Sequence, residues 1–139
     1  MRIKITVLLL IMATVVVPTV CAESEEISIS SFEETVYKRG TVTFNNFLIH
    51  EDDGWMTPRG WHNLKIKLSA KNTAADALSL GLQFVGKDNS GKILWAMNAA
   101  PMMGILSDKS LEDISGSVLV KPGTLERTDT IVVIFAGES

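Results

Sequence analysis

The stretch that decides the fold spans residues 64–97 and opens with Leu64-Lys65-Ile66-Lys67-Leu68-Ser69-Ala70-Lys71. Apolar residues stand at its even positions and polar residues at its odd positions. A second run, residues 77–85, alternates apolar residues with small or polar ones, and a third covers residues 92–97. Such alternation predicts β-strands with one buried face and one solvated face.

The links between these three runs are short and rich in turn-forming residues. Residues 72–76 begin with Asn and end with Asp, and residues 87–91 contain Asp, Asn, Ser and Gly. Those residue types favour tight turns. Because short links join neighbouring antiparallel strands, we predict two hairpins and a three-stranded meander. Trp95, in the third strand, should cap or enter the core.

Residues 1–22 read as a leader rather than as part of the fold. Arg2 and Lys4 precede an apolar run that Pro18 ends, and Ala22 is a suitable residue before a cleavage site. This is the pattern of a secretory signal peptide. The apolar run is shorter than the roughly 20 residues that a membrane span needs. We therefore expect a single domain over residues 23–139 and no stable membrane span after the leader is cleaved.

Cys21 offers an alternative to a freely released protein: a lipoprotein that is cleaved just before Cys21 and anchored through it. The preceding Val20 is atypical for such a cleavage site. Cys21 is also the only cysteine, so a domain cleaved after Ala22 has no disulfide or thiolate ligand. A small secreted domain without disulfides suggests a bacterial source. The expected location is the periplasm, the cell surface or the medium.

The charge balance argues against nucleic acid as a partner. The leader holds two of the 13 basic residues and none of the 16 acidic ones, which leaves 11 basic residues against 16 acidic in the predicted domain. Nucleic-acid-binding domains usually carry a basic patch.

The rest of the chain supplies further short strands separated by turn signals. We predict strands at residues 27–30, 35–44, 117–120 and 130–136, the last one central because both its faces are apolar. Residues 98–106 should cross from one sheet to the other, residues 107–114 should include one helical turn, and residues 121–124 should turn at Pro122-Gly123.

About seven strands at this spacing predict an all-β, antiparallel β-sandwich, with a small β-barrel as the alternative. The predicted core consists of Leu64, Ile66, Leu68, Leu78, Leu80, Leu82, Phe84, Val118, Val120, Ile131, Val133 and Phe135.

Part of the chain resembles a known family. Lys71-Asn72 after one strand, Leu80-Gly81-Leu82-Gln83-Phe84, Lys87-Asp88 and Ser90-Gly91-Lys92-Ile93-Leu94 are similar to the FxLyD-type domains of bacterial exported proteins. Lys121-Pro122-Gly123 resembles the turn before their final strand, whereas Gly86-Lys87 replaces their characteristic Tyr. The resemblance implies an immunoglobulin-like sandwich and an exported location, and it carries no functional site.

Residues 51–63 form the only long segment that combines charges, turn residues and two tryptophans. We predict an ordered loop, bent at Pro58 and Gly60, whose candidate binding residues are Trp55, Met56, Arg59 and Trp61. Two interpretations are open: an exposed aromatic platform that binds a protein or a sugar ring, or a plug over the end of the sandwich. The plug is slightly favoured, because tryptophans usually bury much of their area.

The same segment contains carboxylates and histidines that could bind a metal. His50, Glu51, Asp52, Asp53 and His62 lie close together in the sequence, but their spacing matches no known metal loop. A solvated acidic turn is the preferred interpretation, so no metal and no cofactor are predicted. Met97, Met102 and Met103 could similarly form a soft-metal site or an adaptable surface, but core filling is preferred.

Three functions compete on these grounds. The leading hypothesis is a non-catalytic exported binding module, which uses the loop or a free sheet edge against a protein partner. The alternatives are a carbohydrate-binding module that uses the loop tryptophans and a metal-dependent enzyme at the acidic loop. No serine stands in a nucleophile elbow, and phosphate-binding glycine loops are absent from the sequence, so an enzyme is not expected.

Overall fold

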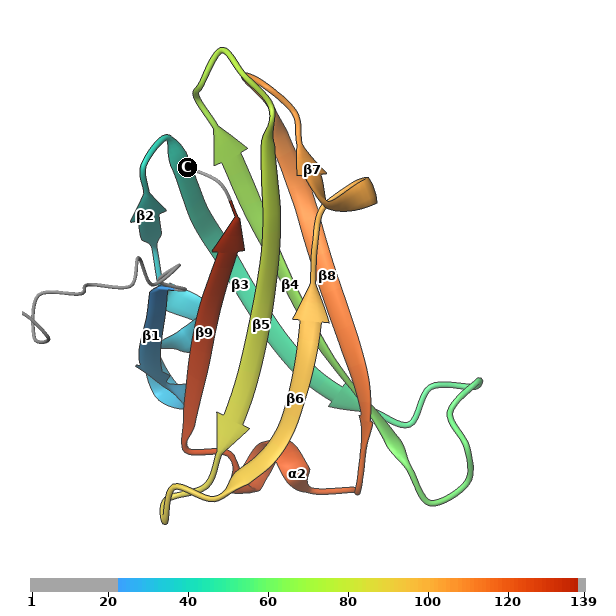
Figure 1. Cartoon of the computed structure of the whole chain (residues 1–139). Helices are drawn as coiled ribbons and strands as arrows, with labels where there is room; N and C mark the ends of the chain where they lie inside the picture. Colours follow the sequence, from blue (N-terminus) through green and yellow to red (C-terminus); the bar gives the residue numbers. More distant parts are fainter. Residues whose placement is uncertain (1–22, 138–139) are drawn as a thin grey trace, which may run out of the picture.

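Two antiparallel sheets pack face to face in the computed structural model, which describes residues 23–137 (Figure 1). The first sheet has the order β1-β9-β5-β6, with β7 also paired to β5, and the second has the order β2-β3-β4-β8. The prediction of an all-β sandwich is confirmed, because the described strands form two separate sheets rather than a closed barrel.

The strand bounds show where the count departs from the expected seven. The first sheet contains β1 (Glu23–Ser28), β5 (Leu78–Lys87), β6 (Ile93–Ala99), β7 (Ile105–Leu106) and β9 (Thr130–Gly137). The second contains β2 (Tyr37–Arg39), β3 (Val42–Asp52), β4 (His62–Asn72) and β8 (Leu111–Val120). The very short strands β2 and β7 account for the two additional strands. β9 lies between β1 and β5, which confirms its predicted central position.

Three short helical segments join the strands. The 3-10 helix η1 (Ile29–Glu34) follows β1, the turn η2 (Met102–Gly104) precedes β7, and α2 (Thr124–Arg127) connects β8 to β9. The predicted first strand therefore begins earlier and ends earlier than expected, and η1 directs the buried ring of Phe32 into the sandwich. The predicted turn at 121–124 is present, and it leads directly into α2, a helix that was not predicted.

The apolar positions of the alternating runs meet between the sheets. Of the 12 predicted core residues, Leu78 and Val118 are partly buried and the others are buried. Trp95 lies in the core as well, only 4% exposed. The prediction missed three phenylalanines that are fully buried, namely Phe32, Phe44 and Phe47.

The predicted meander is wrong at its first turn. β4 belongs to the second sheet and β5 to the first, so residues 73–77 cross between the sheets instead of forming a hairpin. Asn72, only 1% exposed, holds this crossing: its side-chain amide donates to the carbonyl oxygens of Asp76 and Ser107, both at 3.1 Å, and its Oδ1 accepts from the Ala74 amide. Only β5 and β6 form the predicted hairpin.

The crossing from the first sheet back to the second is also displaced. Residues 98–106 stay with the first sheet, because β7 pairs with β5, and the chain crosses at residues 107–110. The helical turn predicted over 107–114 is absent: residues 111–114 already belong to β8, which pairs with β4 along its whole length. An extended ladder with β4 satisfies the backbone groups of this segment better than a single isolated helical turn would.

The two long sides of the sandwich are closed in different ways. On one side, Glu23 of β1 binds two residues of β2: it accepts a hydrogen bond from the Tyr37 hydroxyl at 3.2 Å and pairs with Arg39 at 3.4 Å. Burial and then this hydrogen bond raise the pKa of Tyr37. On the other side, β6 and β8 meet at a bridge between Ala100 and Ser115. Gly116 permits this contact, because a Cβ there would lie 2.5 Å from the Asn98 carbonyl oxygen.

Candidate functional site

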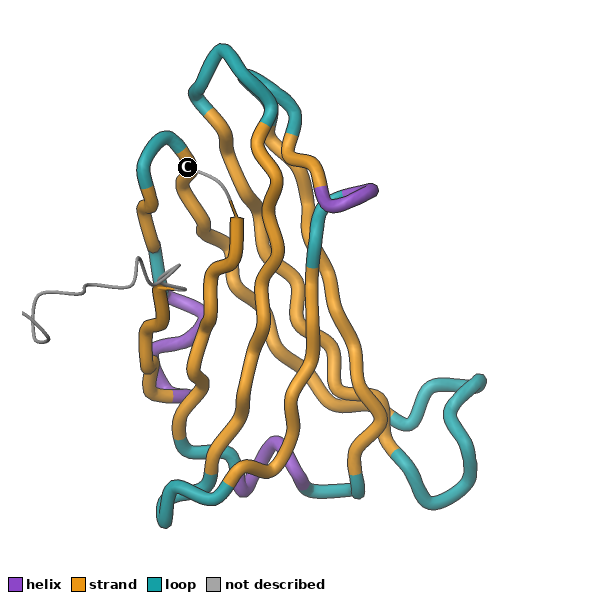
Figure 2. Tube along the Cα trace, viewed as in Figure 1, coloured by secondary structure: helices purple, strands orange, loops and turns teal. Residues whose placement is uncertain are grey.

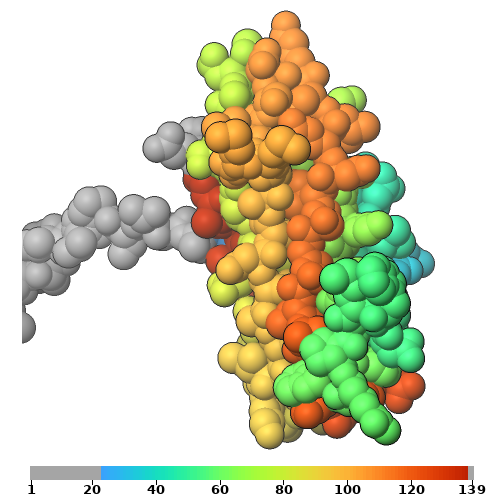
Figure 3. Space-filling model, turned by 90° about the vertical axis from the view of Figure 1, so that its right-hand side faces the viewer, coloured from blue at the N-terminus to red at the C-terminus, as the bar shows by residue number. Residues whose placement is uncertain are grey.

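The β3–β4 loop, residues 53–61, projects away from the sandwich beside the end of β8 (Figures 2 and 3). Two tight turns build it: the Thr57 amide donates to the Gly54 carbonyl at 2.8 Å, and the Trp61 amide donates to the Pro58 carbonyl at 3.0 Å. Gly60 has φ of 82°, a left-handed angle that suits glycine at the third position of the second turn. The predicted bend at Pro58 and Gly60 is therefore confirmed.

The side chains of this loop point mostly into solvent. Trp55 is 93% exposed and Met56 is 78% exposed, and Arg59 is exposed beside them. The plug interpretation is therefore wrong for Trp55, since a plug would bury most of the indole. An indole this exposed loses very little of its hydration on folding, so nearly all of its apolar area is available for binding.

Trp61 differs from Trp55 because it has a partner within the protein. The ammonium group of Lys121 lies 3.8 Å from the centre of the Trp61 ring, and the ring is only 38% exposed. This cation–π contact attaches the end of the loop to the segment after β8. One face of the Trp61 ring is thereby occupied, and the two loop tryptophans do not offer equivalent surfaces.

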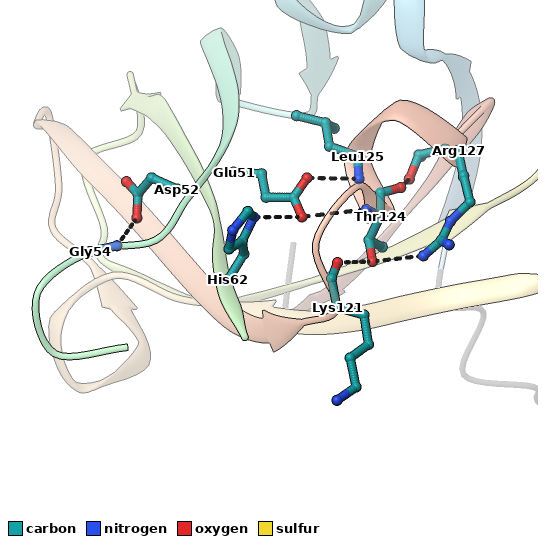
Figure 4. A network of polar contacts seen from close by, with 9 residues as sticks. Glu51, Asp52, Gly54, His62, Lys121, Thr124, Leu125 and Arg127 are labelled. Atoms are coloured by element: carbon teal, nitrogen blue, oxygen red, sulfur yellow. Dashed lines mark hydrogen bonds and ion pairs between the residues drawn. The ribbon is translucent and has the colours of Figure 1, made fainter. Parts of the chain in front are cut away.

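The base of the loop is anchored by Glu51 (Figure 4). Its side chain is only 9% exposed, and its two oxygens accept hydrogen bonds from the amides of Thr124 and Leu125 at 3.3 and 3.2 Å. The same carboxylate lies 3.3 Å from Nδ1 of His62, the first residue of β4. The end of β3, the start of β4 and helix α2 are thus tied to one carboxylate.

This geometry divides the candidate metal ligands into separate pairs. His62 contacts Glu51, whereas His50 contacts Asp52 at 3.3 Å on the outside of the sheet. Asp52 also accepts a hydrogen bond from the Gly54 amide at 3.2 Å, which explains its position as a turn residue. Within residues 23–137, three or more such side chains converge nowhere on a point where they could hold a metal ion.

Comparison of the chain with protein-family models, with curated proteins and with solved structures finds no match. The resemblance to FxLyD-type domains is therefore untested. The predicted leader and Cys21 lie outside the described residues. Among residues 23–137, no helix is long and apolar enough to cross a membrane.

The three methionines considered as a possible site lie in two environments. Met97 is 5% exposed and fills the core as predicted, but Met102 and Met103 are 86% and 90% exposed. The core-filling interpretation is wrong for those two. They occupy the turn η2, where Met103 adopts a left-handed φ of 57° that directs it away from the core.

Residues after β8 join the candidate site although sequence reasoning gave them no role. Lys121, Thr124 and Arg127 stand next to Trp61 and line one groove with it. Lys121 was assigned only to a turn, and α2 is too short to show a helical period. More than 50 residues separate the two segments in the sequence, so no local pattern could have connected them.

Proposed function

We propose that this protein is an exported, non-catalytic binding module whose β3–β4 loop presents Trp55 and Met56 to a protein partner. The observation that carries the proposal is the 93% exposure of Trp55 in a loop whose turns are internally hydrogen-bonded. Tryptophan is the residue type most enriched at the energetic centre of protein interfaces. Export to the periplasm, cell surface or medium is part of the proposal and is supported by the predicted leader.

The anchoring of the loop base supports a role in recognition. Glu51 joins the end of β3 to α2, and Lys121 covers one face of Trp61, so both ends of the loop are tied to the sandwich. A binding loop that is already ordered loses less conformational entropy when it meets its partner. Trp55 and Met56 at the tip make no such structural contribution, which leaves them free for a partner.

The two other candidate functions have less support. A sugar platform of two tryptophans uses one open face of each ring; Lys121 covers one face of Trp61, which is 38% exposed against 93% for Trp55, so Trp61 offers much less surface for stacking. A metal-dependent enzyme needs ligands that converge, and the histidines at positions 50 and 62 instead pair with different carboxylates. We therefore favour a protein partner over a glycan or a metal.

The first test asks whether Trp55 contributes to stability. Because its side chain is almost fully exposed, Trp55→Ala should change the free energy of unfolding by less than about 0.5 kcal/mol. The melting temperature should then fall by less than about 3 °C. Trp95→Ala is the matched control: it removes a buried indole and should cost about 3–5 kcal/mol. A loss of similar size for Trp55→Ala would show that this residue is structural.

The second test asks whether the loop tip contacts a partner. A photo-crosslinking amino acid placed at position 55 should give a discrete protein adduct in the native exported fraction. The same group at position 38, exposed on the far edge strand β2, should not. Adducts at both positions, or at neither, would contradict the proposal. Glycan binding that is lost in Trp55→Ala, or stoichiometric metal found by elemental analysis, would replace it with one of the other two functions.

A further inference from the structure

Strands β6 and β8 leave an opening on the side of the sandwich that also carries the β3–β4 loop. Each is the edge strand of its sheet: β6 pairs with β5 and β8 pairs with β4. They are joined at the Ala100–Ser115 bridge and by the close contact at Gly116. Past this point, along residues 117–120 of β8, the described part of the chain contains no ladder between them. Figure 3 looks onto this side.

A groove of about 250 Å³ occupies the opening. Two consecutive residues of β6, Leu94 and Trp95, line one wall, and three consecutive residues of β8, 118–120, line the other. Successive side chains of a strand point to opposite faces, so consecutive lining residues mean that the strand edges themselves border the groove. Trp61, Lys121, Thr124 and Arg127 complete the lining.

The edge of β8 is the chemical feature that selects the occupant. In an antiparallel ladder, alternate residues direct their N–H and C=O groups away from the paired strand. An edge strand therefore offers a row of backbone groups that can pair with another extended chain. The apolar walls at Leu94 and Val118, both partly exposed, can cover the side chains of such a chain, while the backbone groups hold its main chain.

The charges at the groove indicate which extended chain fits. Lys121 and Arg127 are the charged residues among those that line it, and no acidic residue joins them there. The chain as a whole is acidic, with formal charge −3. A groove with two cations on an acidic protein favours an anionic occupant over a basic one.

We propose that the groove binds an extended peptide segment of a partner protein, which adds to β8 as a strand and places an acidic residue between Lys121 and Arg127. This inference rests on the proposed function, since it names the partner class and gives it a second contact surface beside the loop. Main-chain pairing supplies affinity and the alternate side chains supply specificity, as in other cases of β-strand addition.

The test uses the intact domain and four synthetic peptides. The probe is a capped peptide of alternating valine and threonine with one central aspartate. One counterpart carries lysine instead of the aspartate, and two others carry N-methyl groups on the alternate residues of one edge or of the other edge. We expect the aspartate peptide to bind at least about tenfold tighter than the lysine peptide. N-methylation along one of its two edges should abolish binding, because it removes the donors that pair with β8.

Two readouts locate the peptide on the protein. In an amide NMR titration, the largest shifts should fall at residues 117–120 and around Leu94. Lys121→Glu should weaken the aspartate peptide about tenfold and favour the lysine peptide, whereas Lys38→Glu on the opposite edge of the sheet should change neither. Circular dichroism of each variant verifies that the fold is intact.

Specific results would overturn the inference. No binding of any peptide, equal binding of the N-methylated forms, or amide shifts located elsewhere would each do so. Concentration-dependent self-association with the same amide shifts would also do so, because it would identify a second copy of the protein as the occupant. Failure here with crosslinking at position 55 intact removes the groove and leaves the loop proposal standing. Peptide binding without crosslinking at position 55 removes the loop proposal and leaves the groove as the binding surface.

Discussion

A glycine and a tryptophan on neighbouring strands illustrate how single residues shape this protein. Gly86 of β5 lies opposite Trp95 of β6, and a Cβ at Gly86 would collide with the indole ring. The indole N–H donates to the Thr128 hydroxyl at 3.0 Å, and Thr128 donates to the carbonyl of Thr124 in α2. The missing side chain of Gly86 thus allows Trp95 to reach the base of the groove.

This contact predicts that Gly86→Ala is destabilising. The added methyl group must displace the buried Trp95 ring, and overpacking of this kind costs about 1–3 kcal/mol. Gly81→Ala is the matched control in the same strand, because a Cβ there makes only an ordinary contact of 3.8 Å with a backbone oxygen. Urea denaturation should show a loss for the first variant and little change for the second. Equal losses would show that the backbone, not the tryptophan, sets the requirement for glycine.

A second residue-scale prediction concerns the β5–β6 turn. The carboxylate of Asp88 accepts hydrogen bonds from the hydroxyl of Ser90 at 2.7 Å and from the amides of Ser90 and Lys92. These bonds, chiefly that from the Ser90 hydroxyl, lower the pKa of Asp88. Since the folded pKa lies below the unfolded one, the resulting stability is present above the unfolded pKa and is lost as the pH falls through the folded pKa.

An NMR titration of the side-chain carboxyl carbon measures this shift. We expect the Asp88 pKa to lie below the ordinary aspartate value of about 3.9. Ser90→Ala should move it upward, because it removes the hydroxyl that binds the carboxylate. Ser79→Ala, near the opposite end of β5 from the turn, serves as the control. An unchanged pKa in Ser90→Ala would contradict the assigned cause.

At the scale of elements, the crossing from β4 to β5 depends on Asn72. Asn72→Ala removes the side-chain bonds to the carbonyls of Asp76 and Ser107 and to the Ala74 amide, and it leaves an empty space at a buried position. Each of these lost bonds costs about 1 kcal/mol. We therefore expect a loss of at least about 2 kcal/mol in urea denaturation, against little change for Thr73→Ala, whose hydroxyl makes an exposed bond to the Thr41 carbonyl. A small loss for Asn72→Ala would mean that water replaces the amide.

The same crossing shows what an alternating pattern can and cannot predict. The strands at 64–71 and 77–85 were found because alternation reports which face is buried. A hairpin and a crossing between sheets bury the same alternate residues, so the pattern alone does not distinguish them. Asn72 was noted as a turn former, but its role depends on the carbonyl of Ser107, which is distant in the sequence.

The candidate site, like the crossing, was predictable only in part: the sequence identifies the loop but not the exposure of its side chains or their neighbours. Composition identified the β3–β4 loop, because two tryptophans in a charged, turn-rich segment are conspicuous. The exposure of Trp55 was not predictable, since tryptophan is usually buried. Lys121 and Arg127 could not be placed either, because the groove that they line with Trp61 forms only when β8 returns beside β4.

At the scale of the whole molecule, the two sheets exclude water from a single core. Leu82 of β5 faces that core and is 3% exposed, while the adjacent Gln83 is exposed on the outer face. Leu82→Asp would bury an unpaired charge and should prevent folding, whereas Gln83→Asp should be tolerated. Circular dichroism and thermal melts of both variants check this. Similar melting temperatures would mean that the register of β5 is shifted by one residue.

The pairing of β1 with β9 has a consequence for how the chain is made. Ile27, near the start of the described chain, pairs with Ile131, near its end, and β9 separates β1 from β5. The first sheet therefore lacks the strand that joins β1 to β5 until β9 has left the ribosome. Contacts this distant in sequence also slow folding, because a long loop must close before they form. A nascent chain that has not yet produced β9 therefore cannot complete this sheet, because β1 and β5 then have no strand between them.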